Sequence, residues 1–482
     1  MTSTSTIKIE TDRRQNLIGG QWQPPANRRY IDVEDPYHER PIGLVPASTA
    51  DDVDDALAAA TAAMPSWSAM SGPERADHLD AVRGALSARV EDFATCWARE
   101  VGIPLTVARA ATSGLPVAVL ESAAALARTM PWDEQLAHST LVRRPVGVVG
   151  VITPWNYPLS QIVIKSTAAL AAGCTVIAKP SEVAPLCAFG FADLTVEAGL
   201  PPGVFNLVSG DGLQAGSPLA ADRRIGAVSF TGSTATGAHV MAAAATNITR
   251  VCLELGGKSA SLVLDDGVLE AAVESTVASC MRNSGQTCTS LTRLIVKRSF
   301  AGEATSLAAE LADAYVLGDP LDPATTLGPI ISANQLDRVR GYIWAGVRSG
   351  ATLVTGGADA PPGPDHGYFV KPTVFGDVDP ASPIAQEEIF GPVLSIIVVD
   401  DDDEAVRVAN AVDYGLAGAV WGSDADRAME IARRLDTGSV SINGGTFNPE
   451  APYGGLKRSG IGYELGRFGI EEFLTTRVLN PS

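Results

Sequence analysis

Short apolar runs alternate with longer amphipathic stretches along most of the chain. The run 146–152 is rich in Val and ends shortly before Pro154, which suits a buried strand. Further runs of this kind occupy 175–178, 204–207, 227–230, 261–264, 293–297, 369–375, 393–399, 417–421 and 439–442. Between them, the stretches 51–63, 74–97, 161–172 and 303–314 are typical of helices. The pattern predicts an α/β fold with two lobes, built on mostly parallel, doubly wound sheets.

Length, composition and charge are those of a globular protein and exclude several function classes. The 482 residues exceed what one core needs, and 46% of them are hydrophobic. The net charge of −19 argues against nucleic-acid binding, because that function needs a basic surface. Residues 1–14 lack the apolar core of a secretory signal. Lys165 interrupts the least polar stretch, 160–178, so we expect a core helix running into a strand there and no membrane span.

Cysteine and histidine usage predicts a reducing compartment and no metal site. The six cysteines include no CxxC pair, and the five histidines form no cluster with metal-ligand spacing. The cytoplasm is therefore the expected location.

Cys288 is the first candidate for chemistry. It lies in the polar segment 283–290 (NSGQTCTS), which has no apolar packing face. Gly285 and the small polar neighbours suit a turn whose backbone N–H groups can face an oxyanion. By itself this pattern also fits an ordinary loop cysteine.

Glu254 is the second candidate. Val251, Leu253 and Leu255 surround it in sequence, and partial burial would raise its pKa towards the range of a general base. The alternative is a strand-end acid paired with Lys258. The segment is not a phosphate-binding Walker loop, because its first glycine is absent.

Two polar turns follow predicted strands and favour a nucleotide. The segment 229–237 (SFTGSTATG) opens an Ala-rich helix, whose amino terminus would attract a phosphate. Lys179 and Glu182 follow another strand and could bind ribose hydroxyls. A surface turn with a salt bridge is the alternative for that pair.

Taken together, these segments resemble the aldehyde dehydrogenase superfamily. The matching motifs, in chain order, are PWNYPLS (154–160), KPSE (179–182), FTGS (230–233), ELGGKS (254–259), GQTC (285–288), EEIFGP (387–392) and PYGGLKRSGIGYELG (452–466). They cover roughly 145–469, and the spacing of 288 − 254 = 34 residues is typical of the family. The amino-terminal 140 residues carry few diagnostic motifs.

The resemblance implies a role for each matching residue in catalysis. Cys288 would attack the aldehyde carbon, Asn156 and the Cys288 N–H would form the oxyanion hole, and Glu254 would activate water to release the acid. Lys165 and Glu464 match a proton path behind the base. Glu254 also argues for hydrolytic release, because coenzyme-A-acylating relatives generally lack this base.

The resemblance implies an NAD site as well. The residues matched to the cofactor are Ile152, Thr153, Pro154, Trp155, Lys179, Ser181, Glu182, Gly212, Gly216, Phe230, Thr231, Gly232, Ser233, Leu255, Gly256, Glu388 and Phe390. Glu182 would repel a 2′-phosphate, so we expect NAD to be preferred. NADP remains an alternative, since some relatives with this glutamate use either cofactor.

The predicted substrate is a neutral aldehyde with an apolar aliphatic, aromatic or terpenoid chain. The residues expected to form its tunnel are Tyr157, Ile164, Thr287, Thr289, Phe447 and Tyr453. Ile164 stands where semialdehyde-oxidising relatives tend to have arginine and betaine-aldehyde relatives tryptophan.

By resemblance, the chain has a Rossmann-like cofactor domain (1–127 and 147–256), a catalytic domain (257–456) and a small β element for oligomerisation (128–146 and 470–482). Relatives are dimers or tetramers, and the apolar tail 473–479 suits an edge strand seeking a partner chain. Two rival functions stay open: a cysteine hydrolase, for which no motif supplies a histidine, and a catalytically silent binding protein on the same scaffold.

Overall fold

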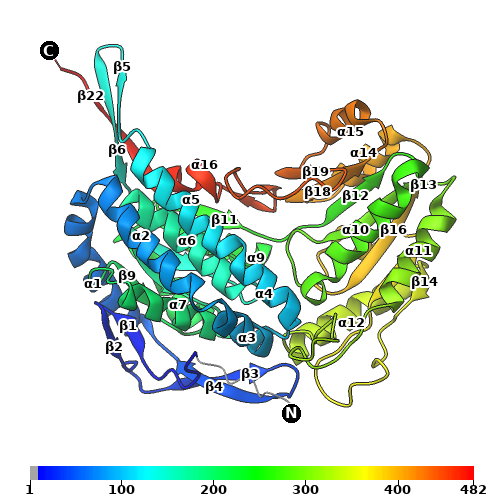
Figure 1. The fold of residues 1–482 in the computed structure, drawn as a ribbon, viewed down its shortest axis with the longest axis horizontal. Helices are drawn as coiled ribbons and strands as arrows, with labels where there is room; N and C mark the ends of the chain where they lie inside the picture. Colours follow the sequence, from blue (N-terminus) through cyan, green and yellow to red (C-terminus); the bar gives the residue numbers. More distant parts are fainter. Residues whose placement is uncertain (1–8, 482) are drawn as a thin grey trace.

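The computed structural model describes residues 9–481. Residues 1–8, part of the segment predicted to lack a secretory signal, lie outside the described residues, as does residue 482. Two β-sheets covered by helices form the body of the molecule, and a three-stranded arm extends from it (Figure 1). This is the α/β architecture that the apolar pattern predicts.

The first sheet has the strand order β2-β1-β9-β8-β7-β10-β11-β21. Its strands are β1 (Asn16–Ile18), β2 (Gln21–Gln23), β7 (Val148–Ile152), β8 (Thr175–Lys179), β9 (Phe205–Leu207), β10 (Ile225–Thr231), β11 (Arg250–Glu254) and β21 (Gly460–Ile461). The chain runs outward from β7 to β8 and β9, then returns to place β10 and β11 on the other side of β7. The strand order therefore reverses between β7 and β10, the point where open parallel sheets bind ligands.

Helices cover both faces of this sheet because its strands are apolar on both sides. Val149 and Val151 of β7 pack with one group of helices, and Val148 and Ile152 pack with the other. The first group is α2 (Gly72–Ser87), α3 (Val90–Val101), α5 (Leu115–Thr129), α6 (Pro158–Ala172) and α7 (Leu186–Glu197). The second is α1 (Ala50–Ala69), α8 (Ser217–Ala221) and α9 (Thr234–Ala245).

The second sheet has the order β14-β15-β16-β13-β12-β18-β19. Its strands are β12 (Ser259–Val263), β13 (Leu291–Lys297), β14 (Thr352–Thr355), β15 (Thr373–Gly376), β16 (Val393–Val399), β18 (Ala417–Trp421) and β19 (Ser439–Ile442). The helices α10 (Leu269–Met281) and α11 (Ala301–Asp313) cover one face. The other face packs against α12 (Ala333–Arg348), α13 (Pro383–Gln386), α14 (Asp402–Asn410) and α15 (Ala425–Ala432).

One helical segment differs from the sequence-based expectation. The single helix predicted over 74–97 is two helices, α2 and α3, because Arg89 leaves helical geometry at φ −123°. By length and composition alone, the helical stretch Leu105–Thr129 is long and apolar enough to cross a membrane. It is also two helices, α4 (Leu105–Ser113) and α5, which are separated at Gly114, and α5 packs against α2 and α6.

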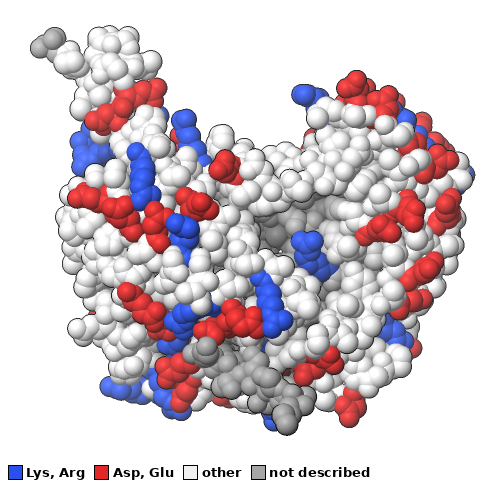
Figure 2. Space-filling view, viewed as in Figure 1, with Lys and Arg blue, Asp and Glu red and all other residues white. Residues whose placement is uncertain are grey.

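The arm consists of β5 (Asp133–Leu136), β6 (Ser139–Pro145) and β22 (Leu474–Leu479). β22 pairs antiparallel with β6 over its whole length. Figure 1 shows the arm projecting away from both sheets, with the carboxyl terminus at its tip. Acidic side chains are spread over the face drawn in Figure 2, and basic ones form no continuous stripe there.

Candidate active site

Parallel register brings five predicted site residues to one edge of the first sheet. Ile152 is level with Lys179 on one side and with Phe230 on the other, and Thr231 is level with Glu254. Each of these positions is at or next to the carboxyl end of its strand. The residues singled out in separate motifs therefore lie along one line, at the edge where ligands bind in such sheets.

A left-handed turn positions Cys288. Asn283, Ser284 and Gly285 all have positive φ, at 50°, 55° and 74°. A side chain at Gly285 would meet the carbonyl carbon of Gly391 at 2.1 Å, so only glycine fits. Non-glycine residues adopt this geometry at an energetic cost, and such strain is common at functional sites.

Buried side chains that the sequence reading did not assign hold this turn in place. The Ser284 hydroxyl donates to the Gly328 carbonyl at 2.7 Å. The Gln286 side chain accepts from the Ile331 N–H at 3.0 Å and donates to the Asn283 carbonyl at 3.0 Å. The only sequence signal was the run of polar residues without an apolar face, because the partners lie far along the chain.

Asn156 lies against the nucleophile segment. Its side-chain amide donates to the Gln286 carbonyl at 3.0 Å, which leaves its second N–H free for another acceptor. Trp97 fixes the Asn156 backbone by donating to its carbonyl at 3.1 Å. Within residues 9–481, the backbone N–H of Cys288 donates to no protein group. Both N–H groups are thus candidates for binding an oxyanion.

Cys288 is half-buried, whereas the other five cysteines are buried. Its Sγ atom lies 3.4 Å from the hydroxyl of Tyr453. Burial raises the pKa of the thiol to about 12, and the negative charge of Glu254 adds to this. The thiol is therefore protonated at neutral pH in the protein alone, and its reaction requires loss of that proton.

Glu254 is a buried acid of the kind the sequence predicts. The side chain is 3% exposed and its Oε1 atom is buried without a hydrogen bond among the described residues. Burial, followed by the charge of Glu464, raises the pKa of Glu254 well above its usual value. Gly454 lies against this carboxyl, and the adjacent Tyr453 contacts Cys288, so acid and thiol share one site.

Lys165 and Glu464 form a buried ion pair behind Glu254. Its charges act on the base in opposite directions, since Lys165 lowers the pKa of Glu254 and Glu464 raises it. The pair thus joins the two residues matched to the proton path and places them next to the base.

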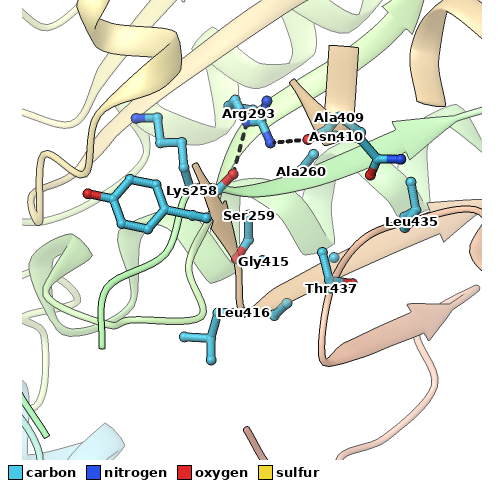
Figure 3. Close-up of a pocket in the computed structure, with 13 residues that line it drawn as sticks. Lys258, Ser259, Ala260, Arg293, Ala409, Asn410, Gly415, Leu416, Leu435 and Thr437 are labelled. Carbon is cyan, nitrogen blue, oxygen red and sulfur yellow. Dashed lines mark hydrogen bonds between the residues drawn. The ribbon is translucent and has the colours of Figure 1, made fainter. Parts of the chain in front are cut away.

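The alternative pairing of Glu254 with Lys258 does not form. The Lys258 ammonium is buried without a hydrogen-bond partner among the described residues. Burial lowers the pKa of Lys258 to about 7. In Figure 3, Lys258 borders a pocket, where Arg293 donates to the Lys258 carbonyl at 2.9 Å. This pocket is not lined by any of the residues that we assigned to the reaction from the sequence.

A second buried cluster contains potential metal ligands. Atoms of Cys96, Glu100 and Cys187 lie within 4.8 Å of one another. The Glu100 carboxylate accepts from the N–H groups of Leu186 at 2.7 Å and Cys187 at 3.1 Å. Glu100 thus satisfies the first turn of α7, which accounts for its position without an ion.

The residues matched to the adenosine and phosphate part of NAD surround the ends of β8 and β10. The Lys179 ammonium donates to the Gly210 carbonyl at 2.7 Å and lies 3.4 Å from the Glu182 carboxylate. Ser233 caps α9 by accepting from the Thr236 N–H at 3.1 Å. The Gly232 N–H donates to the Glu254 carbonyl at 3.1 Å, which ties this turn to the base.

Glu388 marks the nicotinamide end of the expected cofactor site. It accepts from the Gly257 N–H at 3.0 Å, and a side chain at Gly256 would meet its carboxylate at 2.3 Å. Burial raises the pKa of Glu388 to about 6. The rings of Trp155 and Phe390 stand edge to face at 5.3 Å.

The remaining cofactor positions follow the same edge. Thr153 and Thr231 have buried hydroxyls without partners in the described part of the chain. The others are Pro154 after β7, Ser181 after β8, Leu255 after β11, and Gly212 and Gly216 at the two ends of a short π-helical turn. Unpaired hydroxyls, a helix amino terminus and a glycine cradle are the donor set that a dinucleotide needs, so the residues fit NAD.

The expected tunnel residues are partly gathered around Cys288. The Tyr157 hydroxyl bonds to the Thr287 hydroxyl at 2.9 Å, and the Tyr157 ring contacts Trp97 at 5.1 Å. Phe447 lies 6.1 Å from the Tyr453 ring and is 58% exposed, as at a tunnel mouth. Thr289 is half-buried beside the nucleophile. Ile164 lines an apolar pocket next to α5 together with Ala168 and Pro449.

The site combines this sheet edge with a cysteine, a buried acid and an amide. Comparison of the chain with known proteins identifies the enzyme class to which such a site belongs. A model described as the aldehyde dehydrogenase family matches residues 22–479. The chain belongs to the aldehyde dehydrogenase family, as its motifs indicated.

Three relatives place the chain within this family. It is 43% identical to a 3-succinoylsemialdehyde-pyridine dehydrogenase of a Pseudomonas species, over 97% of this chain and 98% of the relative. It is 43% identical to a geranial dehydrogenase of Castellaniella defragrans, over 94% of this chain and 96% of the relative. The crystal structure of a cysteine-to-alanine variant of aldehyde dehydrogenase C from Pseudomonas syringae, in complex with NAD+ and octanal, matches with a TM-score of 0.97, 42% identity and 98% coverage of both chains.

Proposed function

We propose that this enzyme oxidises an aldehyde to a carboxylic acid with NAD+ as the oxidant, using Cys288 as a covalent nucleophile. One observation carries the proposal: the Cys288 thiol contacts Tyr453, the adjacent Gly454 lies against the buried carboxyl of Glu254, and Asn156 donates to the Gln286 carbonyl two residues before the thiol. None of the hydrogen bonds of Cys288 within residues 9–481 involves a histidine, which disfavours a Cys–His hydrolase.

The residues divide the reaction into two steps. Cys288 Sγ attacks the aldehyde carbon, and Asn156 with the Cys288 N–H stabilises the oxyanion of the thiohemiacetal by roughly 3 kcal/mol. When bound, NAD+ supplies the hydride acceptor. Glu254 then takes a proton from water, which attacks the thioester carbonyl and releases the acid and the Cys288 thiol. A base with a raised pKa suits this proton transfer near neutral pH.

Lys179, Glu182, Ser233 and Glu388 would hold the cofactor. The Glu182 carboxylate beside Lys179 would repel a 2′-phosphate, which favours NAD over NADP. The P. syringae relative whose structure contains NAD+ supports this assignment. A ratio of kcat/KM values that clearly favours NADP would contradict it.

The substrate we propose is a neutral aldehyde with an apolar chain. Tyr453 contacts Cys288, Tyr157 bonds to the neighbouring Thr287, and Phe447 packs against Tyr453. Ile164, which is matched to the same tunnel, offers neither a cation nor a cation–π face. The geranial dehydrogenase and the P. syringae relative whose crystal structure contains octanal support this class. The relative named for a pyridine semialdehyde agrees with an aromatic chain.

The decisive experiment follows NADH formation with octanal, geranial, benzaldehyde and succinic semialdehyde. We expect turnover with the apolar aldehydes that is lost in Cys288→Ala, while Cys280→Ala, which alters a buried cysteine, retains it. A preference for succinic semialdehyde would contradict the substrate class. No reduction of NAD+ or NADP+ with any aldehyde would favour the silent-scaffold alternative.

A further inference from the structure

The hydroxyl of Tyr453 is the one side-chain group among residues 9–481 that hydrogen-bonds to the sulfur of Cys288, at 3.4 Å. The contact joins two segments 165 positions apart. The backbone of Tyr453 is held by two hydrogen bonds with Glu464, at 2.8 and 2.7 Å. The Phe447 ring packs against the Tyr453 ring. The tyrosine is therefore positioned by the fold as well as by the sulfur.

The surroundings of Cys288 otherwise oppose the thiolate, which is the reactive form of cysteine. Partial burial of the thiol and the nearby carboxyls of Glu254 and Glu388 disfavour a negative charge on the sulfur. Among the described residues, no Lys, Arg or His side chain hydrogen-bonds to the sulfur. In the described part of the chain, the Tyr453 hydroxyl is the side-chain group placed to donate a hydrogen bond to the sulfur.

Tyr453 is suited to remain a donor throughout the reaction. Burial and the neighbouring thiol raise the pKa of its hydroxyl well above 10, so the group stays protonated at working pH. A neutral O–H gives a short, charge-assisted hydrogen bond to an anionic sulfur and a weak one to a neutral thiol. The contact therefore favours the thiolate over the thiol.

We propose that Tyr453 is a catalytic residue whose hydroxyl donates a hydrogen bond to the Cys288 thiolate and so activates the nucleophile. The thiol proton passes to water, the sulfur keeps the electron pair, and the Tyr453 O–H remains intact. When the sulfur attacks the aldehyde carbon, the negative charge moves to the oxygen near Asn156, and the hydrogen bond from Tyr453 weakens. This role rests on the proposed function of Cys288 as the nucleophile.

The test is the pH dependence of Cys288 alkylation by iodoacetamide, followed by mass spectrometry without aldehyde or NAD. The other five cysteines are buried, so the reaction reports on Cys288. We expect Tyr453→Phe to move the midpoint to higher pH and to slow alkylation at neutral pH by about tenfold or more. Tyr157→Phe is the matched control, because its hydroxyl bonds to Thr287 and not to the sulfur.

Two outcomes would overturn the proposal: an unchanged profile in a folded Tyr453→Phe protein, or an equal shift in Tyr157→Phe. Thermal unfolding checks that each variant folds, and Tyr453→Leu provides a second variant without the hydroxyl. Because alkylation needs neither substrate nor cofactor, its result is independent of whether the wild type oxidises aldehydes. Failure of the proposed function would appear only in the NADH assay.

Discussion

At the residue scale, Glu254 separates the two halves of the proposed reaction. Its carboxyl is buried, and the Oε1 atom has no hydrogen-bond partner among the described residues. We expect Glu254→Gln to retain thioester formation but to slow its hydrolysis about a hundredfold or more. Rapid mixing with octanal should then give a burst of NADH close to one equivalent per site, followed by slow turnover. Loss of the burst together with turnover would show that Glu254 acts before the thioester forms.

Glu388 predicts a pH dependence of cofactor binding. Burial raises the pKa of this carboxyl to about 6, and only the ionised form can accept hydrogen bonds from a ribose through both oxygens. NAD+ affinity should therefore be full above this pH and fall by up to about tenfold per pH unit below it. Titration of protein fluorescence with NAD+ measures the effect. Glu388→Gln should bind weakly with a flat profile, and an equally steep fall in that variant would assign it to another group.

At the scale of single elements, the turn before Cys288 has a tight steric constraint close to the reacting sulfur. Gly285→Ala would place a methyl group 2.1 Å from the Gly391 carbonyl carbon at a positive φ. The turn must then rearrange, and we expect both NADH turnover and Cys288 alkylation to fall at least about tenfold. Gly302→Ala in α11 is the matched control, because its added methyl group meets no atom within 4 Å. Equal activity of both variants would contradict a requirement for this turn geometry.

Some elements of the fold could be predicted from the sequence, and others could not. Buried parallel strands such as β16 and β18 were predictable to the residue, because apolar runs bounded by polar turns have one stable arrangement in a two-sided sheet. The break between α2 and α3 at Arg89 could not be predicted, since no glycine or proline interrupts the helical pattern there. The positions of Cys288 and Glu254 followed from motifs. Their contacts with Tyr453 and Gly454 depend on packing between segments far apart in the chain.

At the scale of the whole molecule, the two sheets have different tasks in the proposed reaction. The first sheet presents the residues assigned to NAD and the base at its carboxyl edge. Cys288 precedes β13 of the second sheet, and Gly257 between β11 and β12 lies against its carbonyl. The reaction therefore depends on how the two sheets meet, and a change there can alter turnover without touching a reacting group.

The arm of β5, β6 and β22 leads to a last prediction, that it joins this chain to a second copy. Leu136, Val478 and Leu479 are 58%, 52% and 47% exposed on an arm that projects from the body, where an unpartnered apolar surface is costly. We expect the wild type to be a dimer or tetramer by light scattering, and Val478→Glu to shift it towards the monomer, because burial of an unpaired charge opposes association. Leu353→Glu, on the exposed strand β14, is the matched control and should leave the mass unchanged. An unchanged mass for Val478→Glu would place any interface elsewhere, and a monomeric wild type would remove the role of the arm in assembly.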